Sequence, residues 1–421
     1  MKNTKEIHFE EAIEYHLTEN DKYIKGDSAD FDPDLCLEKD TIINFIKQTQ
    51  LKTWHSLEVI HGDETDNVLI DDLRKHINTK GMLSIIRNGF KCFGKKFKVA
   101  YFLPNNQLND DTLTLYKKNR LSVTRQLYFS DKDRKSLDMA IFLNGLPVVT
   151  LELKNKFTGQ STEHSKKQYK NDRDSNEPIF QFKKGALVHF AVDTDLAFMT
   201  TRLSGKKTFF LPFNLGFNDG AGNPPAEDGG YRTAYLWREV LQSDSLLDIL
   251  NRFMHLQVEE KKILKDNVLK KIKKEVMIFP RYHQLDVVRK LIDDSKTNGA
   301  GKNYLVQHSA GSGKSNSIAW LAHRLSSLHT ENDEKKYDFD DFINDRVQND
   351  FEKIILKKYP SIAKTKKWLS KYGKSRMTGT GGTFFIDFES AEKAERALLA
   401  IVENKPQSLP KNYKAIIVKS H

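Results

Sequence analysis

Three residues of one short stretch have the types and the spacing that metal-dependent hydrolysis of a phosphodiester needs. Asp138 lies in the run SLDMAIFL, and Glu152 and Lys154 lie in the run LPVVTLELK. Two carboxylates held side by side repel each other, and a cation between them relieves that repulsion. Mg²⁺ suits such a pair because it takes carboxylate, water and phosphate oxygens as ligands. A lysine beside them is placed to stabilise charge on the phosphate or to orient the attacking water.

A β-hairpin is predicted to bring these residues together. Asn144-Gly145 joins the two runs and is the strongest short-range hairpin signal in a sequence. Residues two apart in a strand share a face, so Glu152 and Lys154 are expected to project together while the intervening leucines project to a buried face. This D-x(n)-E-x-K arrangement is that of the PD-(D/E)xK nuclease core. A merely solvated charged face on an edge strand is the alternative, and the sequence leaves it open.

The periodicity of the flanking segments predicts an α/β surrounding for this hairpin. Residues 5–17 form an amphipathic pattern with Glu10, Glu11 and Glu14 on the exposed side. The segment 214–231 is dense in Gly, Pro, Asn and Asp and is predicted to be a long loop, either functional or a disordered insert. The remaining predicted elements are helices at 41–48, 68–77 and 245–257 and strands at 121–130, 136–154 and 186–203.

A lysine-rich stretch, EEKKILKDNVLKKIKKEVMIFPRYHQ, follows at 259–284. It is interpreted either as a basic helix that faces DNA or as a solvated helix or linker. The stretch leads into a helix–strand–turn–helix pattern, with the strand predicted at 303–308 and helices at 282–296 and 314–328. This order is typical of the opening of a parallel α/β domain.

A candidate phosphate-binding loop, SAGSGKS, occupies Ser309–Ser315, between that strand and the second helix. Glycine-rich backbone N–H groups at a helix N-terminus form an anion site. Lys314 is expected to reach the β/γ-phosphates and Ser315 to hold Mg²⁺, with Gly311 and Gly313 shaping the loop. The strict Walker pattern requires glycine where His308 stands, so a glycine-rich helix start with an exposed lysine is the alternative.

Composition bounds the class of protein. The 421 residues include 68 Lys+Arg and 57 Asp+Glu, which gives a net charge of +11. This surplus suits a polyanionic partner such as nucleic acid, although a lysine-rich surface explains it equally well. Cys36 and Cys92 alone cannot form a disulfide scaffold or a Cys-based zinc site. The first residues carry no signal-peptide core and no apolar run approaches the roughly 18 residues of a membrane helix, so a soluble, cytoplasmic protein without a membrane partner is expected.

The segments 119–174 and 209–253 resemble the nuclease domain of the restriction (R) subunit of type I restriction–modification enzymes. The resemblance rests on NRLSVTRQLYFS, KSLDMAIFLNGLPVVTLELKN and FFLPFNLGFNDGAGNPP. It implies that Asp138, Glu152 and Lys154 are the catalytic residues and that the two carboxylates bind the metal. An acidic residue of the N-terminal helix often assists in that family, which points to Glu11 or Glu14.

The same resemblance extends to a substrate-positioning residue and to the motor. Some members carry Q-x-x-x-Y on the helix after the catalytic strand, and Gln168 matches its first position. Asp172 replaces the tyrosine, which puts the role of Gln168 in doubt, although Tyr169 is adjacent. The loop A/S-x-G-S-G-K-S is similar to motif I of superfamily 2 helicases. The run FPRYHQ resembles the adenine-reading Q-type motif, which implies that Gln284 reads the base of ATP.

The resemblance to the R subunit stops near residue 335, before the second lobe of such a motor. The run TFFIDFE only superficially resembles the acidic strand of a helicase, since Asp387 and Glu389 are not adjacent. Residues 338–421, with NDFEKIILKKYP and WLSKYGKSRMTGTGGTFFIDFESAEKAERAL, instead resemble the C-terminal end of 4-diphosphocytidyl-methylerythritol kinase, a GHMP-family kinase. The kinase phosphate loop is missing here. The three glycines of this run are expected to form a tight turn: Gly379, Gly381 and Gly382.

The expected architecture is therefore α/β, with three parts. A PD-(D/E)xK nuclease domain with a mixed central sheet is expected at 1–255, a linker and truncated start of a RecA-like lobe at 256–337, and a small α+β piece at 338–421. The expected function is that of the R subunit of an ATP-dependent type I restriction endonuclease, with the motor lost by truncation. Its expected cofactors are Mg²⁺ and ATP, and its partners are double-stranded DNA and the methylation and specificity subunits. The alternatives are a non-translocating DNA- or subunit-binding remnant and a small-molecule kinase fragment.

Overall fold

The computed structural model divides the chain into two compact units, Met1–Lys336 and Tyr337–His421. It describes residues 3–104, 110–132, 134–156, 159–218, 220–265, 268–299, 302–309, 311–326, 350–378, 383–386, 388, 390–404 and 406. The junction at 330–345, the three glycines near residue 380, and Asp387 and Glu389 lie outside the described residues, so the expectations for them stay predictions.

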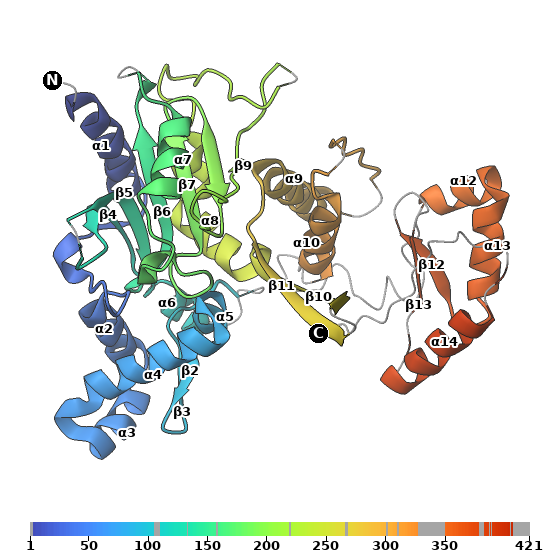
Figure 1. The fold of residues 1–421 in the computed structure, drawn as a ribbon, viewed down its shortest axis with the longest axis horizontal. Coiled ribbons are helices and arrows are strands. Elements are labelled where there is room, and N and C mark those ends of the chain that lie inside the picture. Colours follow the sequence, from blue (N-terminus) through green and yellow to red (C-terminus); the bar gives the residue numbers. More distant parts are fainter. Residues whose placement is uncertain are drawn as a thin grey trace. The chain divides into compact units, whose positions relative to one another are not determined.

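The first unit is built on a seven-stranded mixed sheet with the order β1-β4-β5-β6-β7-β8-β9 (Figure 1). The β1–β4 and β6–β7 pairs are parallel and the other neighbours are antiparallel. This confirms the expected α/β fold with a mixed central sheet. The strands are β1 (Ile24–Lys25), β4 (Leu121–Tyr128), β5 (Ser136–Leu143), β6 (Leu146–Lys154), β7 (Val188–Asp193), β8 (Ala197–Thr200) and β9 (Leu211–Pro212).

The predicted β5–β6 hairpin is present, and its turn shows why Asn-Gly is needed. Asn144 and Gly145 have φ values of 51° and 86°, the left-handed pair that a type I′ turn requires. The Asn144 side chain accepts a hydrogen bond from the backbone N of Arg120 at 2.6 Å and donates one to the Val99 carbonyl at 2.8 Å. A Cβ atom on Gly145 would lie 2.7 Å from the carbonyl oxygen of Glu38, so glycine is required for space as well.

Some helices of the first unit pack on the sheet, and others pack on one another. Helix α7 packs on β6 and β7, and α1 packs on β4 and β6. The apolar core between α7 and the sheet includes Leu127, Phe142, Tyr169 and Phe180. The helices of this part are α1 (Asn3–Glu19), α2 (Lys39–Thr49), α3 (Leu51–His61), α4 (Thr65–Lys80), α5 (Met82–Asn88), α6 (Asp110–Tyr116), α7 (Thr162–Asn171) and α8 (Ser243–Asp248), with a short hairpin of β2 (Phe90–Cys92) and β3 (Lys95–Phe97).

The N-terminal helix forms as predicted, but its acidic side is not exposed. Glu10 and Glu14 are buried, and only Glu11 is open to solvent. Arg125 of β4 explains the difference, because its guanidinium lies 3.2 Å from Glu10 Oε2 and 3.5 Å from Glu14 Oε2. The apolar residues of the same helix, Phe9 and Ile13, are buried as well. Both sides of α1 therefore have partners.

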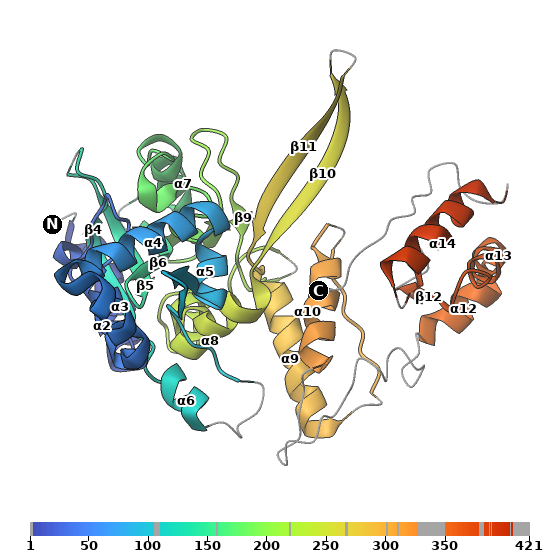
Figure 2. The same cartoon turned by 90° about the horizontal axis from the view of Figure 1, so that it is seen from below.

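From Glu259 to Ile278 the lysine-rich stretch is neither a helix nor a linker. It forms β10 (His255–Lys265) and β11 (Val268–Ile278), a two-stranded antiparallel ribbon. Lysine and glutamate favour helices only weakly. Cross-strand pairing between the two runs, which also contain Ile, Leu and Val, outweighs that preference. Figure 2 shows the ribbon as a long element that extends beyond the sheet and its helices.

The strand predicted at 303–308 is also absent. Residues 302–309 are irregular, and Leu305 is 89 % exposed. A buried parallel strand needs neighbours on both sides, and no strand of the described residues pairs with this segment. The helices on either side of it do form, as α9 (Tyr282–Asn298) and α10 (Lys314–Ser326), and they pack on each other.

The described residues of the second unit form two helices, a two-stranded hairpin and a further helix, in that order. Its elements are α12 (Asp350–Lys358), α13 (Pro360–Leu369), β12 (Ser375–Thr378), β13 (Thr383–Ile386) and α14 (Ala391–Glu403). Across the described parts of both units, no helix combines the length and the apolar character that crossing a membrane requires.

Candidate active site

The β5–β6 hairpin brings Asp138 and Lys154 together. The backbone N of Leu153 donates a hydrogen bond to Asp138 Oδ2 at 2.7 Å, and Lys154 Nζ lies 3.7 Å from the same oxygen. The side chains of Asp138 and Lys154 are 15 % and 12 % exposed. The pair therefore sits at the margin of the solvent, where a phosphate group can approach it.

Glu152 lies deeper than the strand alternation alone predicts. Its side chain is fully buried, because α7 and the segment after it cover this face of β6. Arg173 Nε donates a hydrogen bond to Glu152 Oε1 at 2.6 Å, while Glu152 Oε2 has no hydrogen-bond partner in the described part of the chain. Burial and the charge of Asp138 raise the pKa of Glu152 to about 8, against the opposing charges of Arg173 and Lys154.

Arg173 is a site residue that the sequence analysis missed. It follows the end of α7, and its side chain is 3 % exposed. Besides its contact with Glu152, its Nη2 donates to the Ser136 carbonyl at 2.7 Å, which ties it to the start of β5. No sequence pattern pointed to it, because Arg173 lies beyond the last residue of α7 and reaches Glu152 only through the packing of that helix on β6.

A buried polar trio lies behind Glu152 on the same face of the sheet. Thr150 Oγ1 is 2.8 Å from the Tyr169 hydroxyl and 2.7 Å from His189 Nδ1. Burial lowers the pKa of His189 to about 3, so its imidazole is neutral at physiological pH. Burial, followed by the charge of Glu152, raises the pKa of Tyr169. The trio fixes α7 against the sheet and thereby fixes the position of Arg173.

Gln168 is not brought into this network. It is half-buried on α7, and in the part of the chain that the structure describes its side chain makes no hydrogen bond. Asp172, in the place of the family tyrosine, only donates its backbone N to the Gln168 carbonyl, at 2.8 Å. The neighbouring Tyr169 is the residue of this helix that reaches the site.

Helix α1 places Glu10, rather than Glu11 or Glu14, in electrostatic contact with Asp138. Glu10 accepts hydrogen bonds from Gln126 Nε2 at 3.0 Å and from Arg125 Nε at 3.2 Å. Burial raises the pKa of Glu10, and the charge of Asp138 adds to that rise. Glu14 is instead paired with Lys25 at 3.0 Å, and Glu11 is half-exposed. Glu10 is therefore the N-terminal acid that is electrostatically coupled to Asp138.

The residues present fit a divalent cation, although they do not form a complete cage. Within the described residues, no group of three or more His, Cys, Asp and Glu side chains is arranged to hold a metal ion. Asp138 and Glu152 supply two carboxylates, and Glu152 Oε2 is a buried acceptor without a hydrogen-bond partner among the described residues. Mg²⁺ is usually bound by one or two carboxylates together with waters and substrate phosphate, which matches this set.

The candidate phosphate loop has the geometry of a glycine turn before a helix. Gly311 and Gly313 have φ values of 74° and 82°, and α10 begins at Lys314. Lys314 Nζ donates to the carbonyl oxygens of His308 and Ser309 at 3.0 and 3.1 Å. Ser315 is exposed at the start of the helix, and Ala310 lies outside the described residues. The lysine thus folds back over the loop, where the charge of a phosphate would replace its carbonyl partners.

Gln284 contacts this loop directly. Its Nε2 donates to the Gly313 carbonyl at 2.9 Å, and its Oε1 accepts from the backbone N of Arg281 at 2.9 Å. A Cβ atom on Gly313 would lie 2.4 Å from Gln284 Nε2, so the glycine permits the contact. The buried amide is therefore engaged in shaping the loop in this structure.

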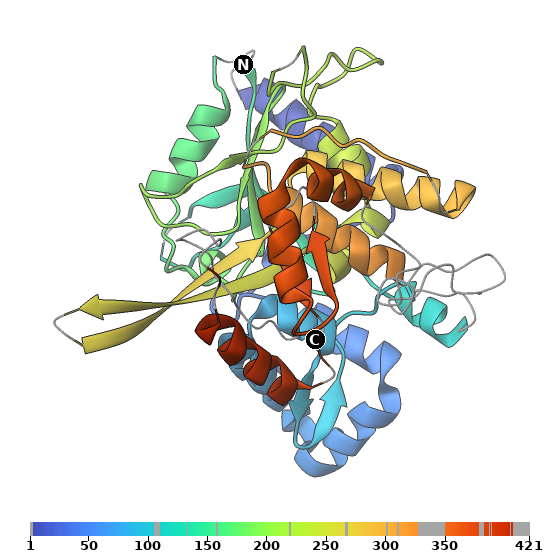
Figure 3. The same ribbon diagram turned by 90° about the vertical axis from the view of Figure 1, so that its right-hand side faces the viewer.

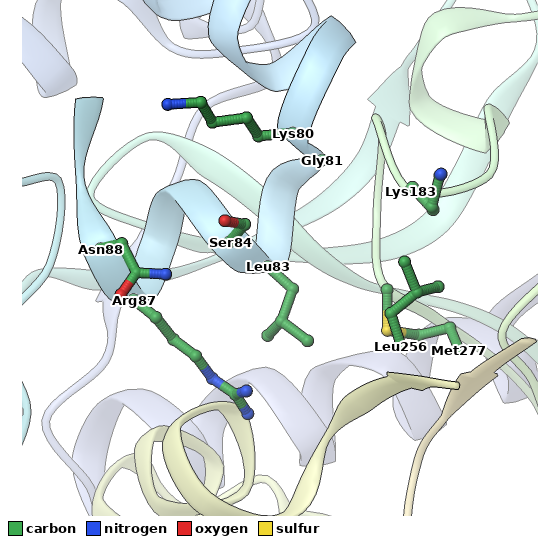
Figure 4. Close-up of a pocket in the computed structure, with 9 residues that line it drawn as sticks. All are labelled: Lys80, Gly81, Leu83, Ser84, Arg87, Asn88, Lys183, Leu256 and Met277. Carbon is green, nitrogen blue, oxygen red and sulfur yellow. The ribbon is translucent and has the colours of Figure 1, made fainter. Parts of the chain in front are cut away.

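A cavity of about 240 Å³ lies apart from both sites (Figure 4). It is lined by residues of α4 and α5, by Lys183, and by Leu256 and Met277 at the base of the ribbon. None of the predicted site residues lines it. The cavity therefore lies at the base of the ribbon and not at the carboxylates of Asp138 and Glu152.

Two parts of the chain match two different families of known proteins. Residues 37–208 match the type I restriction enzyme R protein N terminus. A putative type I restriction enzyme endonuclease subunit of Methanocaldococcus jannaschii is 25 % identical over 67 % of this chain and 25 % of its own length. Asp138, Glu152, Lys154 and Arg173 all fall inside the matched range, and the resemblance stated from the motifs is confirmed.

The C-terminal part matches a different family. Residues 338–407 match the C-terminal domain of GHMP kinases. The 4-diphosphocytidyl-2-C-methyl-D-erythritol kinase of Shewanella woodyi is 41 % identical over 16 % of this chain and 24 % of its own length. That of Colwellia psychrerythraea is 43 % identical over 13 % of this chain and 18 % of its own length. The chain thus spans about a quarter or less of the length of the relatives it matches.

Proposed function

We propose that this chain is a restriction-subunit nuclease of the type I kind, which hydrolyses phosphodiester bonds of double-stranded DNA with a divalent metal. The observation that carries the proposal is the hairpin constellation of Asp138, Glu152 and Lys154, inside a region that matches the R protein N terminus. The PD-(D/E)xK description applies to this hairpin and the sheet around it. The methylation and specificity subunits of a type I complex are the proposed protein partners.

In this proposal each side chain has a defined task. Asp138 and Glu152 would hold Mg²⁺, which when bound polarises the phosphate and lowers the pKa of a water molecule. Lys154 lies beside Asp138 at the solvent margin, so its ammonium group is placed to pair with a phosphate oxygen as negative charge develops. Arg173 holds Glu152 in position, and Glu10 adds negative charge from the side of α1.

The full chain is expected to nick supercoiled plasmid DNA in the presence of Mg²⁺ or Mn²⁺. Asp138→Ala and Lys154→Ala should each lower the nicking rate by at least about 10²-fold, since each removes a group that contacts metal or phosphate. The matched control is Lys156→Ala, two residues further on, whose ammonium pairs with Asp195 at 2.8 Å. Circular dichroism melting checks that the variants fold. Undiminished nicking by folded Asp138→Ala protein would refute the assignment.

The ATP-dependent motor is proposed to be lost in this chain. The loop at Ser309–Ser315 would bind ATP weakly through Lys314 and Ser315, with Gln284 at the adenine, while the acidic pair and the second lobe of a translocase have no counterpart in the sequence. An arginine finger from such a second lobe contributes roughly 10³–10⁵ to the rate in other enzymes. The exposed segment 302–309, which pairs with no strand of the described residues, supports this part of the proposal.

We therefore expect no DNA-stimulated ATP hydrolysis above background. The measurement is phosphate release with and without long duplex DNA, compared between the wild type and Lys314→Ala. Equal, background-level rates are the expected result. A DNA-stimulated rate that Lys314→Ala abolishes would show that the motor is complete.

The exposed segment also favours a second candidate, a non-translocating DNA- or subunit-binding remnant. The two candidates differ in metal-dependent nicking, which only the nuclease shows. A small-molecule kinase fragment is supported by the C-terminal match alone. Phosphoryl transfer to a diphosphocytidyl alcohol would be its signature.

A further inference from the structure

The ribbon β10–β11 is a long element that no other strand of the described residues supports. Eleven residue pairs, from His255↔Ile278 to Lys265↔Val268, form an unbroken antiparallel ladder. At about 3.3 Å per residue this ladder is roughly 36 Å long. Neither strand pairs with another described strand, and Figures 2 and 3 show the ribbon extending from the body of the first unit. An isolated two-stranded hairpin is marginally stable in water, so a ribbon of this length suggests a partner.

The base of the ribbon is fixed to the first unit. The Thr201 hydroxyl donates to the Met277 carbonyl at 2.7 Å, and Met277 is buried. Lys183 forms an ion pair with Glu275. Figure 4 shows Leu256 and Met277 side by side, opposite Arg87 of α5. The ribbon is therefore an anchored arm and not a linker.

Charge is segregated along the arm. Residues 261–272, the outer part of the ribbon, contain five lysines and one aspartate, so their net charge is 5 − 1 = +4. The glutamates stand nearer the base, at Glu259, Glu260 and Glu275. Lys273 and Lys274 are exposed. The outer part of the arm thus carries a high density of positive charge.

The register places one pair of like charges directly opposite each other in that outer part. Lys262 pairs with Lys271 across the ladder, whereas nearer the base Glu260 pairs with Lys273 and Glu259 with Lys274. Like charges directly opposite in an antiparallel pair are destabilising. A polyanion that neutralises the lysines removes that cost, so the arrangement favours a bound polyanion over an empty ribbon.

We propose that the ribbon β10–β11 is an arm that contacts duplex DNA, lying along its major groove with the lysines of residues 261–272 at the flanking phosphates. A two-stranded β-ribbon fits the roughly 12 Å width of that groove, whereas the major groove of A-form RNA is too narrow and deep to admit it. The contacts are with phosphates, so the arm adds affinity without reading sequence. The inference rests on the proposed function only in taking DNA as the polyanion.

A different role for the lysines gives a different outcome. Lysines on exposed strand edges also prevent edge-to-edge association with other chains. If that were their whole role, neutralising them would cause self-association and would leave the affinity for DNA unchanged.

The test compares two hairpins of the same protein. The full-length triple variant Lys262→Gln, Lys270→Gln and Lys271→Gln removes three charges from the arm. The control triple variant Lys91→Gln, Lys95→Gln and Lys96→Gln removes three exposed charges from the short β2–β3 hairpin. Binding to a fluorescent duplex of about 30 base pairs is followed by anisotropy across a NaCl series in EDTA, where no cleavage occurs.

Each phosphate contact contributes about −0.9 to the slope of log affinity against log salt. The arm variant should therefore have a slope shallower by about 2–3 and an affinity at low salt at least about tenfold lower, with the control variant close to wild type. Wild-type affinity in the arm variant, an equal loss in the control, or a preference for duplex RNA would each overturn the inference. Because the assay contains no metal, its result is independent of nicking, and a chain that binds DNA through the arm without cutting it would refute only the proposed function.

Discussion

Binding of Mn²⁺ by the full chain should strengthen about fiftyfold between about pH 6 and about pH 8. The reason is the proton on Glu152, whose pKa burial and the charge of Asp138 raise to about 8. A metal that binds the carboxylate must displace this proton, so the affinity rises about tenfold for each pH unit below the pKa. Isothermal titration calorimetry in buffers of different ionisation enthalpy measures both the affinity and the released proton.

Glu152→Gln is the control for this prediction. It keeps the shape and the contact with Arg173 but cannot release a proton, so the remaining weak binding should lose the pH dependence that Glu152 confers. Asp138→Asn removes the other proposed ligand and should weaken binding while leaving Glu152 to titrate. A wild-type affinity that is constant from about pH 6 to about pH 8 would contradict the role of Glu152.

The same proton has a consequence for the metal-free protein. In the unfolded chain Glu152 ionises near its ordinary pKa of 4.5, whereas in the folded chain it keeps its proton up to about pH 8. Between these values the folded state binds more protons, so the free energy of unfolding falls as pH rises, by up to about 1.4 kcal/mol per unit. Bound metal should abolish the trend, because Glu152 is then ionised in both the folded and the unfolded chain.

The local parts of the fold could be predicted from sequence because their causes are local. The left-handed turn at Asn144-Gly145 sets the β5–β6 hairpin, and strand alternation places Glu152 and Lys154 on one face. Burial of Glu152 could not be predicted in this way. It depends on Arg173, which is 21 residues away and reaches the strand only because α7 packs on β6.

Errors in the sequence analysis arose where a distant partner, or its absence, decides the structure. Glu10 looked exposed because its neighbours on α1 are polar, but Arg125, 115 residues away, buries it. The run 303–308 has the composition of a buried strand, yet no described strand lies beside it. The ribbon was mispredicted because each of its two lysine-rich runs, taken alone, resembles a helix or a linker. The two runs form strands because they supply each other's hydrogen bonds.

Arg173→Met should be among the most destabilising single changes in the first unit, and its cost should grow with pH. In the wild type at about pH 9, Glu152 is ionised and its charge is balanced by the buried guanidinium 2.6 Å away. Methionine fills a similar space but removes a charge that lowers the pKa of Glu152, so the folded variant keeps this carboxyl protonated at about pH 9, which adds about 1.4 kcal/mol to the cost. At about pH 5 the folded chain holds Glu152 protonated in both proteins, so only the hydrogen bonds of Arg173 are lost, at about 1–2 kcal/mol.

Urea denaturation at the two pH values, without metal, measures this difference. Arg232→Met is the matched control, because Arg232 is 43 % exposed and its guanidinium lies 3.9 Å from Asp195. An exposed pair of this kind contributes less than about 1 kcal/mol, with little dependence on pH in this range. The double variant Arg173→Met with Glu152→Gln has no ionisable group at position 152. It should therefore lose the pH dependence and be more stable than Arg173→Met at about pH 9. Equal costs of Arg173→Met at both pH values would mean that Arg173 acts only through packing and its bond to Ser136, and that Glu152 is not held by its charge.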